Sequence, residues 1–205
     1  MIAGRPQPLI RFEGHYFDGR LSTANRIRAR AEGLASPVAG SVANPKTQAG
    51  RWTLLAKARA IDAKAANESA SWGIGQVMGA HWAWLDYASV DALVAEAGGG
   101  VSGQIRLMAR YVDKAGLAPT LRGLDWEAFA RGYNGPQYKR FGYHVKIAAA
   151  YARLNAQPVE TSKGLPDQGA IACAQPDTSD KATPPAVASF WNRLVERLSV
   201  LFNRA

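Results

Sequence analysis

Apolar residues recur at helical spacing along most of the first 155 residues, without a series of alternating strand patterns. The strongest pattern covers residues 51–68, where alanine is frequent and apolar side chains repeat every three or four positions. Shorter helices are predicted over residues 90–97, 102–115, 126–131 and 143–155, and a short exposed helix or loop over residues 21–32. The pattern therefore predicts a mainly α-helical domain.

Glycine, proline and small polar residues mark where these helices begin and end. Gly116 is expected to stop one helix, Asp125 to cap the next, and Gly132 to end it. Residues 36–50 collect prolines, glycines and an asparagine, which predicts a loop.

Residues 70–79 read ASWGIGQVMG, an apolar run that contains three glycines and one amide. Because glycine permits close approach and left-handed backbone, we expect a tight turn that lines a cavity, with Gln76 as its polar recognition group. The alternative is a buried helix junction in which Gln76 is satisfied by local hydrogen bonds.

The composition changes after residue 155. Residues 156–186 hold five prolines among polar residues and are expected to form a disordered linker. Residues 187–205 return to helical periodicity, with an apolar stripe opposite charged residues. This predicted amphipathic helix could dock on the domain, pair with a partner helix or lie on an anionic membrane surface.

The formal charge of +9 is carried entirely by the first 155 residues, which hold 20 Lys and Arg against 11 Asp and Glu. The partner is therefore expected to be anionic, and peptidoglycan carboxylates, teichoic acid, lipid and nucleic acid all satisfy this. A nucleic-acid-binding protein is supported by the charge alone, because no recognition helix or base-stacking motif is evident, and nucleic acid is not expected as the partner.

A single cysteine, Cys173, excludes an intramolecular disulfide and thiolate metal clusters. The three histidines lack ligand spacing, so we expect neither a metal nor a cofactor. No run approaches the ~20 apolar residues of a membrane span, and Pro6 and Pro8 interrupt the N-terminus where a signal peptide needs an apolar segment. Synthesis in the cytoplasm without a signal peptide is the expectation.

Three separated motifs, RFEGHYF at residues 11–17, ASWGIGQVMG at 70–79 and FARGYNGP at 129–136, carry a resemblance. In this order they are similar to the N-acetylmuramidase domain of bacteriophage endolysins, a lysozyme-superfamily group related to goose-type lysozymes and lytic transglycosylases. The match runs from about residue 4 to residue 154. It implies a lysozyme-like helical domain over residues 1–155 that acts as a monomer on peptidoglycan glycan strands after release from the cell. The implied reaction is cleavage of the β-1,4 bond between N-acetylmuramic acid and N-acetylglucosamine.

Glu13 is the candidate catalytic carboxyl, because aliphatic and aromatic neighbours on both sides would partly desolvate it. The alternative is a surface carboxyl beside the end of a strand or helix. Aromatic faces and amides bind sugars, so the candidate substrate-binding residues are Trp72, Gln76, Met78, Trp82, Tyr133 and Asn134. Trp126 and Tyr151 are expected in the core, Glu68 at a helix end on the surface, and Asp18 lacks apolar shelter.

The resemblance also implies a departure from the family. The family's general acid stands on a helix that precedes the segment matching residues 4–17, and this sequence as numbered begins after it. Glu13 matches a second family carboxylate that helps to shape the site. Two interpretations stay open: the true start lies upstream of Met1, or the chain binds glycan without cleaving it.

We expect a peptide of residues 187–205 to become helical when phosphatidylglycerol vesicles are added, because its apolar stripe would then be buried in the lipid interface. Circular dichroism with and without vesicles measures this, and an unchanged spectrum would refute the membrane interpretation.

Overall fold

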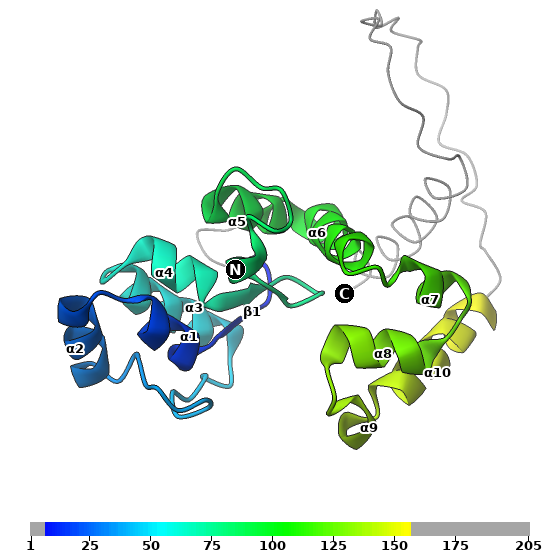
Figure 1. Cartoon of the computed structure of the whole chain (residues 1–205), viewed down its shortest axis with the longest axis horizontal. Coiled ribbons are helices and arrows are strands. Elements are labelled where there is room, and N and C mark those ends of the chain that lie inside the picture. Colours follow the sequence, from blue (N-terminus) through cyan, green and yellow to red (C-terminus); the bar gives the residue numbers. More distant parts are fainter. Residues whose placement is uncertain (1–6, 157–205) are drawn as a thin grey trace, which may run out of the picture. The chain divides into compact units, whose positions relative to one another are not determined.

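The structure is a computed structural model that describes residues 7–156 (Figure 1). The described chain forms two compact units, residues 7–116 and residues 117–156. The predicted domain of residues 1–155 contains both units, whereas the predicted linker and amphipathic helix lie outside the described residues. No helix among the described residues is long and apolar enough to cross a membrane.

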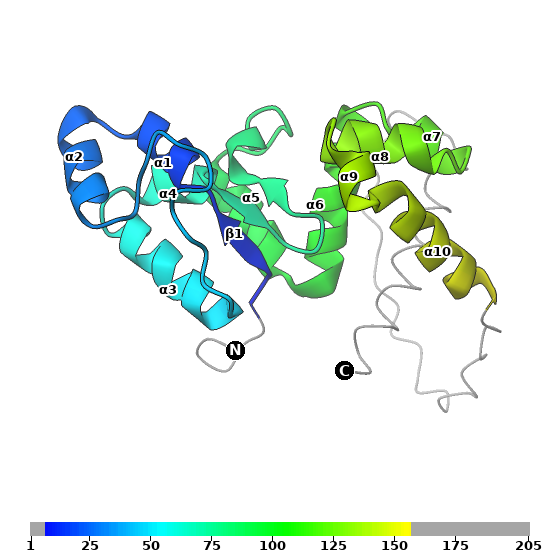
Figure 2. The ribbon, with the colours of Figure 1, turned by 90° about the horizontal axis from the view of Figure 1, so that it is seen from below.

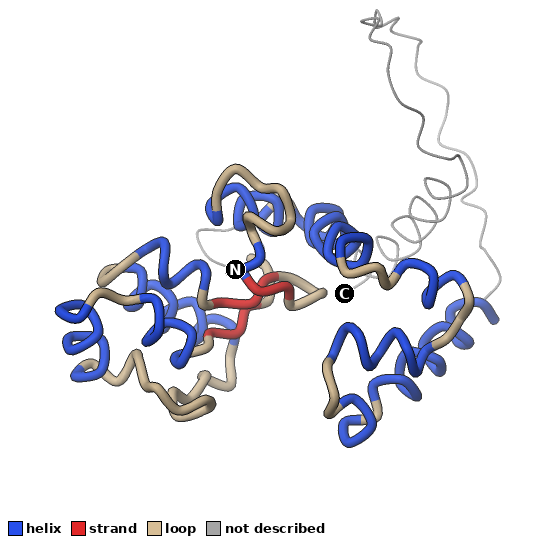
Figure 3. Tube along the Cα trace, viewed as in Figure 1, coloured by secondary structure: helices blue, strands red, loops and turns tan. Residues whose placement is uncertain are grey.

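The first unit is helical around a small sheet, as Figure 3 shows. Its helices are α1 (Gly14–Arg20), α2 (Thr23–Ala31), α3 (Gln48–Arg59), α4 (Ala63–Glu68), the short 3-10 helix η1 (Gly79–His81), α5 (Val90–Gly98) and α6 (Gly100–Lys114). The predicted helices over residues 90–97 and 102–115 are confirmed, and Gly116 follows α6 with a φ of +67°, as a helix-stopping glycine should. The mainly helical prediction is thus confirmed.

Three short strands form an antiparallel sheet in the order β1 (Ile10–Phe12), β2 (Ala70–Trp72) and β3 (Val77–Met78). Ile10 pairs with Trp72, which in turn pairs with Val77. The sequence pattern did not predict these strands, because two or three residues are too few to show an alternation. Pairing stabilises them instead: β1 pairs with β2 about 60 positions away, and β2 pairs with β3 across a tight hairpin.

The outer edge of β1 is closed by side chains rather than by a fourth strand. The backbone N–H of Phe12 donates to Asn44 Oδ1 at 2.9 Å, and Asn44 Nδ2 donates to the Phe12 carbonyl at 2.7 Å. The Ile10 N–H donates to Gln48 Oε1 at 3.0 Å. The predicted loop over residues 36–50 therefore supplies the hydrogen bonds that an exposed strand edge needs, up to the start of α3 at Gln48.

The helix predicted over residues 51–68 is wrong as a single element, because the chain breaks between α3 and α4. Asp62 adopts an extended backbone, and its carboxyl accepts a hydrogen bond from the Ala65 N–H at 2.9 Å. This N-cap starts a second helix in a new direction. Apolar spacing continued across the break and concealed it.

Asn67, at the end of α4, is a buried polar hub of the first unit. Its side-chain oxygen accepts from Arg59 Nε at 2.7 Å, and its side-chain nitrogen donates to Asp91 Oδ1 at 2.9 Å. Its backbone carbonyl accepts from the indole N–H of Trp72 at 3.1 Å. One residue thus joins α3, α5 and the sheet, and burial of Arg59 lowers the pKa of its guanidinium.

The second unit comprises α7 (Ala118–Arg122), α8 (Trp126–Asn134), α9 (Tyr138–Phe141) and α10 (Tyr143–Ala156). Asp125 caps α8 as predicted, its carboxyl accepting from the Ala128 N–H at 2.9 Å. Gly132 does not end this helix: α8 continues to Asn134, and Gly135 with a φ of +78° follows it. Only the residue with left-handed backbone marks the true end.

Replacing Gly79 by alanine should lower the stability of the protein by about 2 kcal/mol or more, because a Cβ there would lie 2.1 Å from the Asn67 carbonyl oxygen. Gly19→Ala is the matched control, since no atom lies within 4 Å of the position that its Cβ would take, and alanine favours the helix. Thermal unfolding of both variants tests this, and equal melting temperatures would contradict the close approach at Gly79.

Candidate functional site

One face of the sheet gathers residues from two of the three motifs. Arg11 on β1 pairs with Ser71 on β2, and Ser71 pairs with Met78 on β3, so these side chains form one row. Glu13 lies two positions after Arg11 and shares its side of the extended chain. The structure therefore brings Glu13, Met78 and the hairpin of Gln76 to the same face.

Glu13 is held by cationic and backbone contacts. Arg11 Nε donates to its Oε1 at 2.8 Å, and His15 Nδ1 lies 3.7 Å from its Oε2. Its own backbone N–H donates to the Ser69 carbonyl at 2.8 Å. Its side chain is only 21% exposed, which agrees with the expected partial desolvation. The sequence predicted apolar neighbours for Glu13, and the structure adds the cationic Arg11 to them.

Gln76 closes the hairpin between β2 and β3. Its side-chain nitrogen donates to the Gly73 carbonyl at 2.7 Å, and its side-chain oxygen accepts from the Ser71 hydroxyl at 2.9 Å. The backbone of Gln76 is left-handed, with a φ of +48°, which strains a residue that carries a side chain. The predicted tight turn is confirmed. The hydrogen bonds of Gln76 match the alternative interpretation, in which the amide is satisfied locally, but the residue is exposed and not buried.

Trp72 corrects the predicted set of substrate-binding residues. Its side chain is fully buried, it packs edge-on against Trp52 at 5.8 Å, and its indole N–H is bonded to Asn67. Successive strand residues point to opposite faces, so the register that places Ser71 in one row with Arg11 and Met78 directs Trp72 to the opposite face, into the core. It therefore presents no face to a sugar.

Trp82 follows η1 and is half-buried. Its indole N–H donates to Glu68 Oε1 at 2.8 Å, and Lys64 Nζ lies 5.8 Å from its ring centroid. Glu68 Oε2 also pairs with Arg20 Nε at 3.3 Å, and its side chain is only 16% exposed. Glu68 thus links three elements, which differs from the simple surface residue that its helix-end position suggested.

Trp84 was missed by the sequence interpretation. It is 43% exposed, and its ring contacts those of His81 and Tyr111 at centroid distances of 5.6 Å. Burial, with a smaller contribution from Arg20, lowers the pKa of His81, so this imidazole stays neutral over a wider range of pH. The sequence signal that could have identified Trp84 is a second tryptophan two positions after Trp82.

Asp18 is a structural carboxylate. Arg30 donates to both of its oxygens, at 2.6 and 2.8 Å, and the side chain is buried. Hydrogen bonds from Arg30, together with the charges of Arg30 and Arg26, hold the pKa of Asp18 below its usual value. This pair fastens α1 to α2, and Asp18 is accordingly no substitute for a catalytic acid.

Tyr133 and Asn134 belong to the second unit. Tyr133 is half-buried and stacks on Phe129 at 5.4 Å, and Asn134 is the exposed last residue of α8. Trp126 and Tyr151 contact each other at 5.0 Å, but Tyr151 is 41% exposed, so its predicted core position is wrong, whereas Trp126 is half-buried. The motif of residues 129–136 thus belongs to the second unit, and the other two motifs belong to the first.

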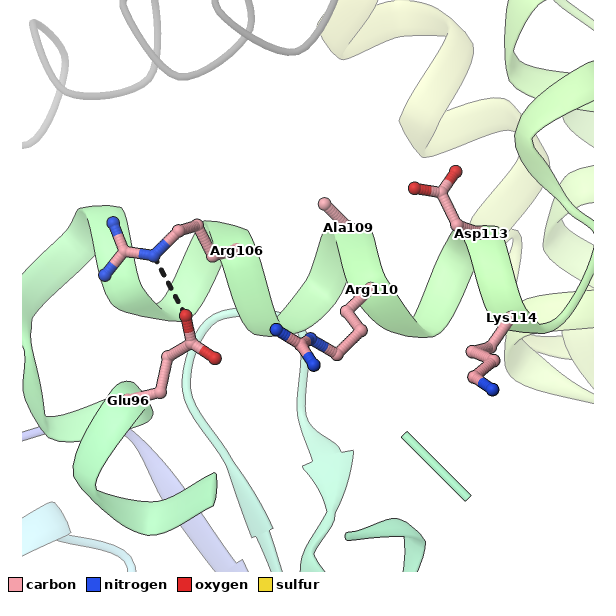
Figure 4. Close-up of a pocket in the computed structure, with 6 residues that line it drawn as sticks. All are labelled: Glu96, Arg106, Ala109, Arg110, Asp113 and Lys114. Carbon is pink, nitrogen blue, oxygen red and sulfur yellow. Dashed lines mark hydrogen bonds and ion pairs between the residues drawn. The ribbon is translucent and has the colours of Figure 1, made fainter. Parts of the chain in front are cut away.

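A shallow hollow of about 560 Å³ lies along α6, and no residue of the hairpin lines it (Figure 4). It is lined by Glu96, Arg106, Ala109, Arg110, Asp113 and Lys114. Arg106 Nε pairs with Glu96 Oε1 at 2.9 Å, and Lys114 pairs with Asp86 at 2.8 Å, so its cations are largely compensated. Residues 7–156 contain no cluster of three His, Cys, Asp or Glu able to hold a metal ion.

A helical domain with a three-stranded sheet, carrying a Gly-rich hairpin beside a paired carboxylate, matches one family of proteins. The family model of N-acetylmuramidase matches residues 2–155, and the chain belongs to this family. The fold is accordingly the lysozyme-like, mainly α fold that the resemblance implied.

The crystal structure of the Burkholderia AP3 phage endolysin is similar to this chain, with a TM-score of 0.64 and 32% sequence identity. The similarity covers 75% of this chain and 58% of that one, so the chain spans little more than half of the endolysin. A comparison with curated proteins gave no match.

The left-handed backbone at residue 76 generates a prediction about stability. Gln76→Ala should destabilise the protein, because it removes the side-chain hydrogen bonds and keeps the strain. Gln76→Gly loses the same bonds but relieves the strain, and should be about 1 kcal/mol more stable than Gln76→Ala. Chemical denaturation of the two variants measures the difference; an alanine variant as stable as the glycine variant would show that φ is not constrained.

Proposed function

We propose that this chain is a peptidoglycan hydrolase of the muramidase type that cleaves the β-1,4 bond between N-acetylmuramic acid and N-acetylglucosamine. The observation that carries the proposal is the shared sheet face of Glu13, Gln76 and Met78, in a chain of the N-acetylmuramidase family. The similar crystal structure, a phage endolysin, supports the same assignment.

Glycoside hydrolysis develops positive charge at the anomeric carbon, and a nearby carboxylate stabilises it. Glu13 suits this electrostatic role, because the contact with Arg11 holds its Oε1 in place. Its Oε2 lies 3.7 Å from His15 Nδ1. Arg11 itself is 55% exposed, so the pair stands at the edge of solvent, where a glycan strand can reach it.

Sugar recognition would then fall to the groups around the hairpin. The exposed Gln76 amide can exchange its local hydrogen bonds for a sugar N-acetyl group, and the half-buried Met78 offers an apolar contact. Trp82 and the exposed Trp84 offer ring faces. Such a protein would be made in the cytoplasm and act as a monomer on the cell wall after release.

A second candidate function is glycan binding without cleavage. It is favoured by the contacts of two carboxyls near the hairpin: Glu13 is paired with Arg11, and Glu68 with Arg20 and Trp82. A general acid must reach the leaving oxygen of the glycosidic bond, and these contacts already occupy oxygens of both carboxyls.

We expect Glu13→Gln to reduce the release of reducing sugar from purified sacculi at least tenfold, because the amide keeps a hydrogen bond from Arg11 but loses the charge. Glu32→Gln is the matched control, since it also neutralises an arginine-paired carboxylate, in the exposed Arg28 pair of α2. Both variants should melt within a few degrees of the parent.

Equal sugar release by Glu13→Gln and the parent would remove Glu13 from the mechanism. Parent protein that sediments with sacculi and releases no sugar would replace hydrolysis by the binding function. Failure to sediment and failure to release sugar would together overturn both proposals.

A further inference from the structure

Helix α9 leads into α10 at a corner of the second unit (Figure 2). Apolar and cationic residues of this corner are exposed. We define this basic aromatic corner as Arg140, Phe141, Tyr143, Val145 and Lys146. The guanidinium of Arg140 lies 5.7 Å from the Phe141 ring, and Lys146 Nζ lies 5.9 Å from the Tyr143 ring. The two rings are 5.8 Å apart, so these four residues are linked, and the exposed Val145 lies beside Lys146 in the sequence of α10.

The charge of this corner is not compensated by acidic neighbours. Residues 128–156 contain five Lys and Arg and no Asp or Glu. Within the described chain, Lys139 is paired with Glu127 at 2.7 Å, whereas Arg140 and Lys146 have ring contacts and no acidic partner. Two cations are thus left to attract an anion.

The apolar members of the corner are unusually exposed. Phe141 is 50% exposed and Val145 is 61% exposed, although neither side chain can form a hydrogen bond with water. Gly142, with left-handed backbone at a φ of +65°, turns the chain between them and fixes both near the same corner. Exposed apolar groups flanked by free cations fit a surface that is anionic outside and apolar beneath.

Helix α2 shows that exposure beside arginines does not by itself create such a surface. Ile27 is 67% exposed between arginines, but Arg28 pairs with Glu32, and both Arg26 and Arg30 pair with Asp18. Each arginine of α2 is paired with a carboxylate within the described chain, whereas the two cations of the corner are not.

We propose that the basic aromatic corner binds the surface of an anionic phospholipid bilayer, with Arg140 and Lys146 on the headgroups and Phe141 and Val145 in the interface. A soluble anionic polymer would use the cations but would leave Phe141 and Val145 exposed, which is why lipid is the better match. The inference does not depend on glycan cleavage, because the corner contains none of the candidate site residues.

The test is co-sedimentation of the full chain with vesicles of phosphatidylglycerol and phosphatidylcholine, compared with vesicles of phosphatidylcholine alone. Arg140→Gln combined with Lys146→Gln should weaken binding to the anionic vesicles about tenfold. Phe141→Ser should weaken it severalfold, and this loss should persist at high salt, where charge is screened. Residues 187–205 are the same in every variant, so differences between variants report on the corner.

Arg28→Gln combined with Arg106→Gln is the matched control, because it removes the same net charge from two exposed arginines that are already paired with Glu32 and Glu96. It should bind vesicles almost as the parent does, and circular dichroism should show all variants folded. Three outcomes would each overturn the proposal: equal losses in the two double variants, equal binding to neutral vesicles, or no loss in Phe141→Ser. A change of oligomeric state in Phe141→Ser without a change in vesicle binding would instead assign the corner to contact between copies.

Discussion

The register of the three-stranded sheet is the constraint on which the rest of the first unit depends. Pairing of Ile10 with Trp72 fixes which residues of two distant segments face the core and which face outward. A shift by one residue would bury Arg11 and expose Trp72, which would cost both the desolvation of a cation and the loss of the largest fully buried side chain. The position of Glu13 therefore follows from packing on the opposite face.

Polar side chains hold this register in place from both sides. Asn44 and Gln48 satisfy the free edge of β1, and Asn67 receives the indole N–H of Trp72 while it joins Arg59 to Asp91. Apart from the exposed Asp91, these groups are buried or half-buried, so an unmade hydrogen bond in the network would be costly. A site built on such a frame keeps its carboxylate and hairpin in fixed relation, which recognition of a rigid polymer requires.

The excess of positive charge has two different structural meanings. In the first unit, many cations are paired with a carboxylate and mainly fasten elements or orient side chains. These residues are Arg11, Arg20, Arg28, Arg30, Arg106 and Lys114. In the second unit, cations gather where acidic residues are absent from the sequence and lie against exposed rings. The cationic residues behind the net charge of +9 therefore belong partly to an internal network of ion pairs and partly to an exposed surface.

The sequence by itself determined most helices, the cap at Asp125, the stop at Gly116 and the tight turn around Gly73, because local spacing and backbone preference act within a few residues. Its motifs also identified the family. Only the tertiary structure decided that Trp72 is buried, that Gln76 is bonded to its own hairpin and that Glu68 meets Arg20 and Trp82. Strands of two or three residues carry too little local information, and the faces of β1 and β2 are set by pairing across about 60 positions.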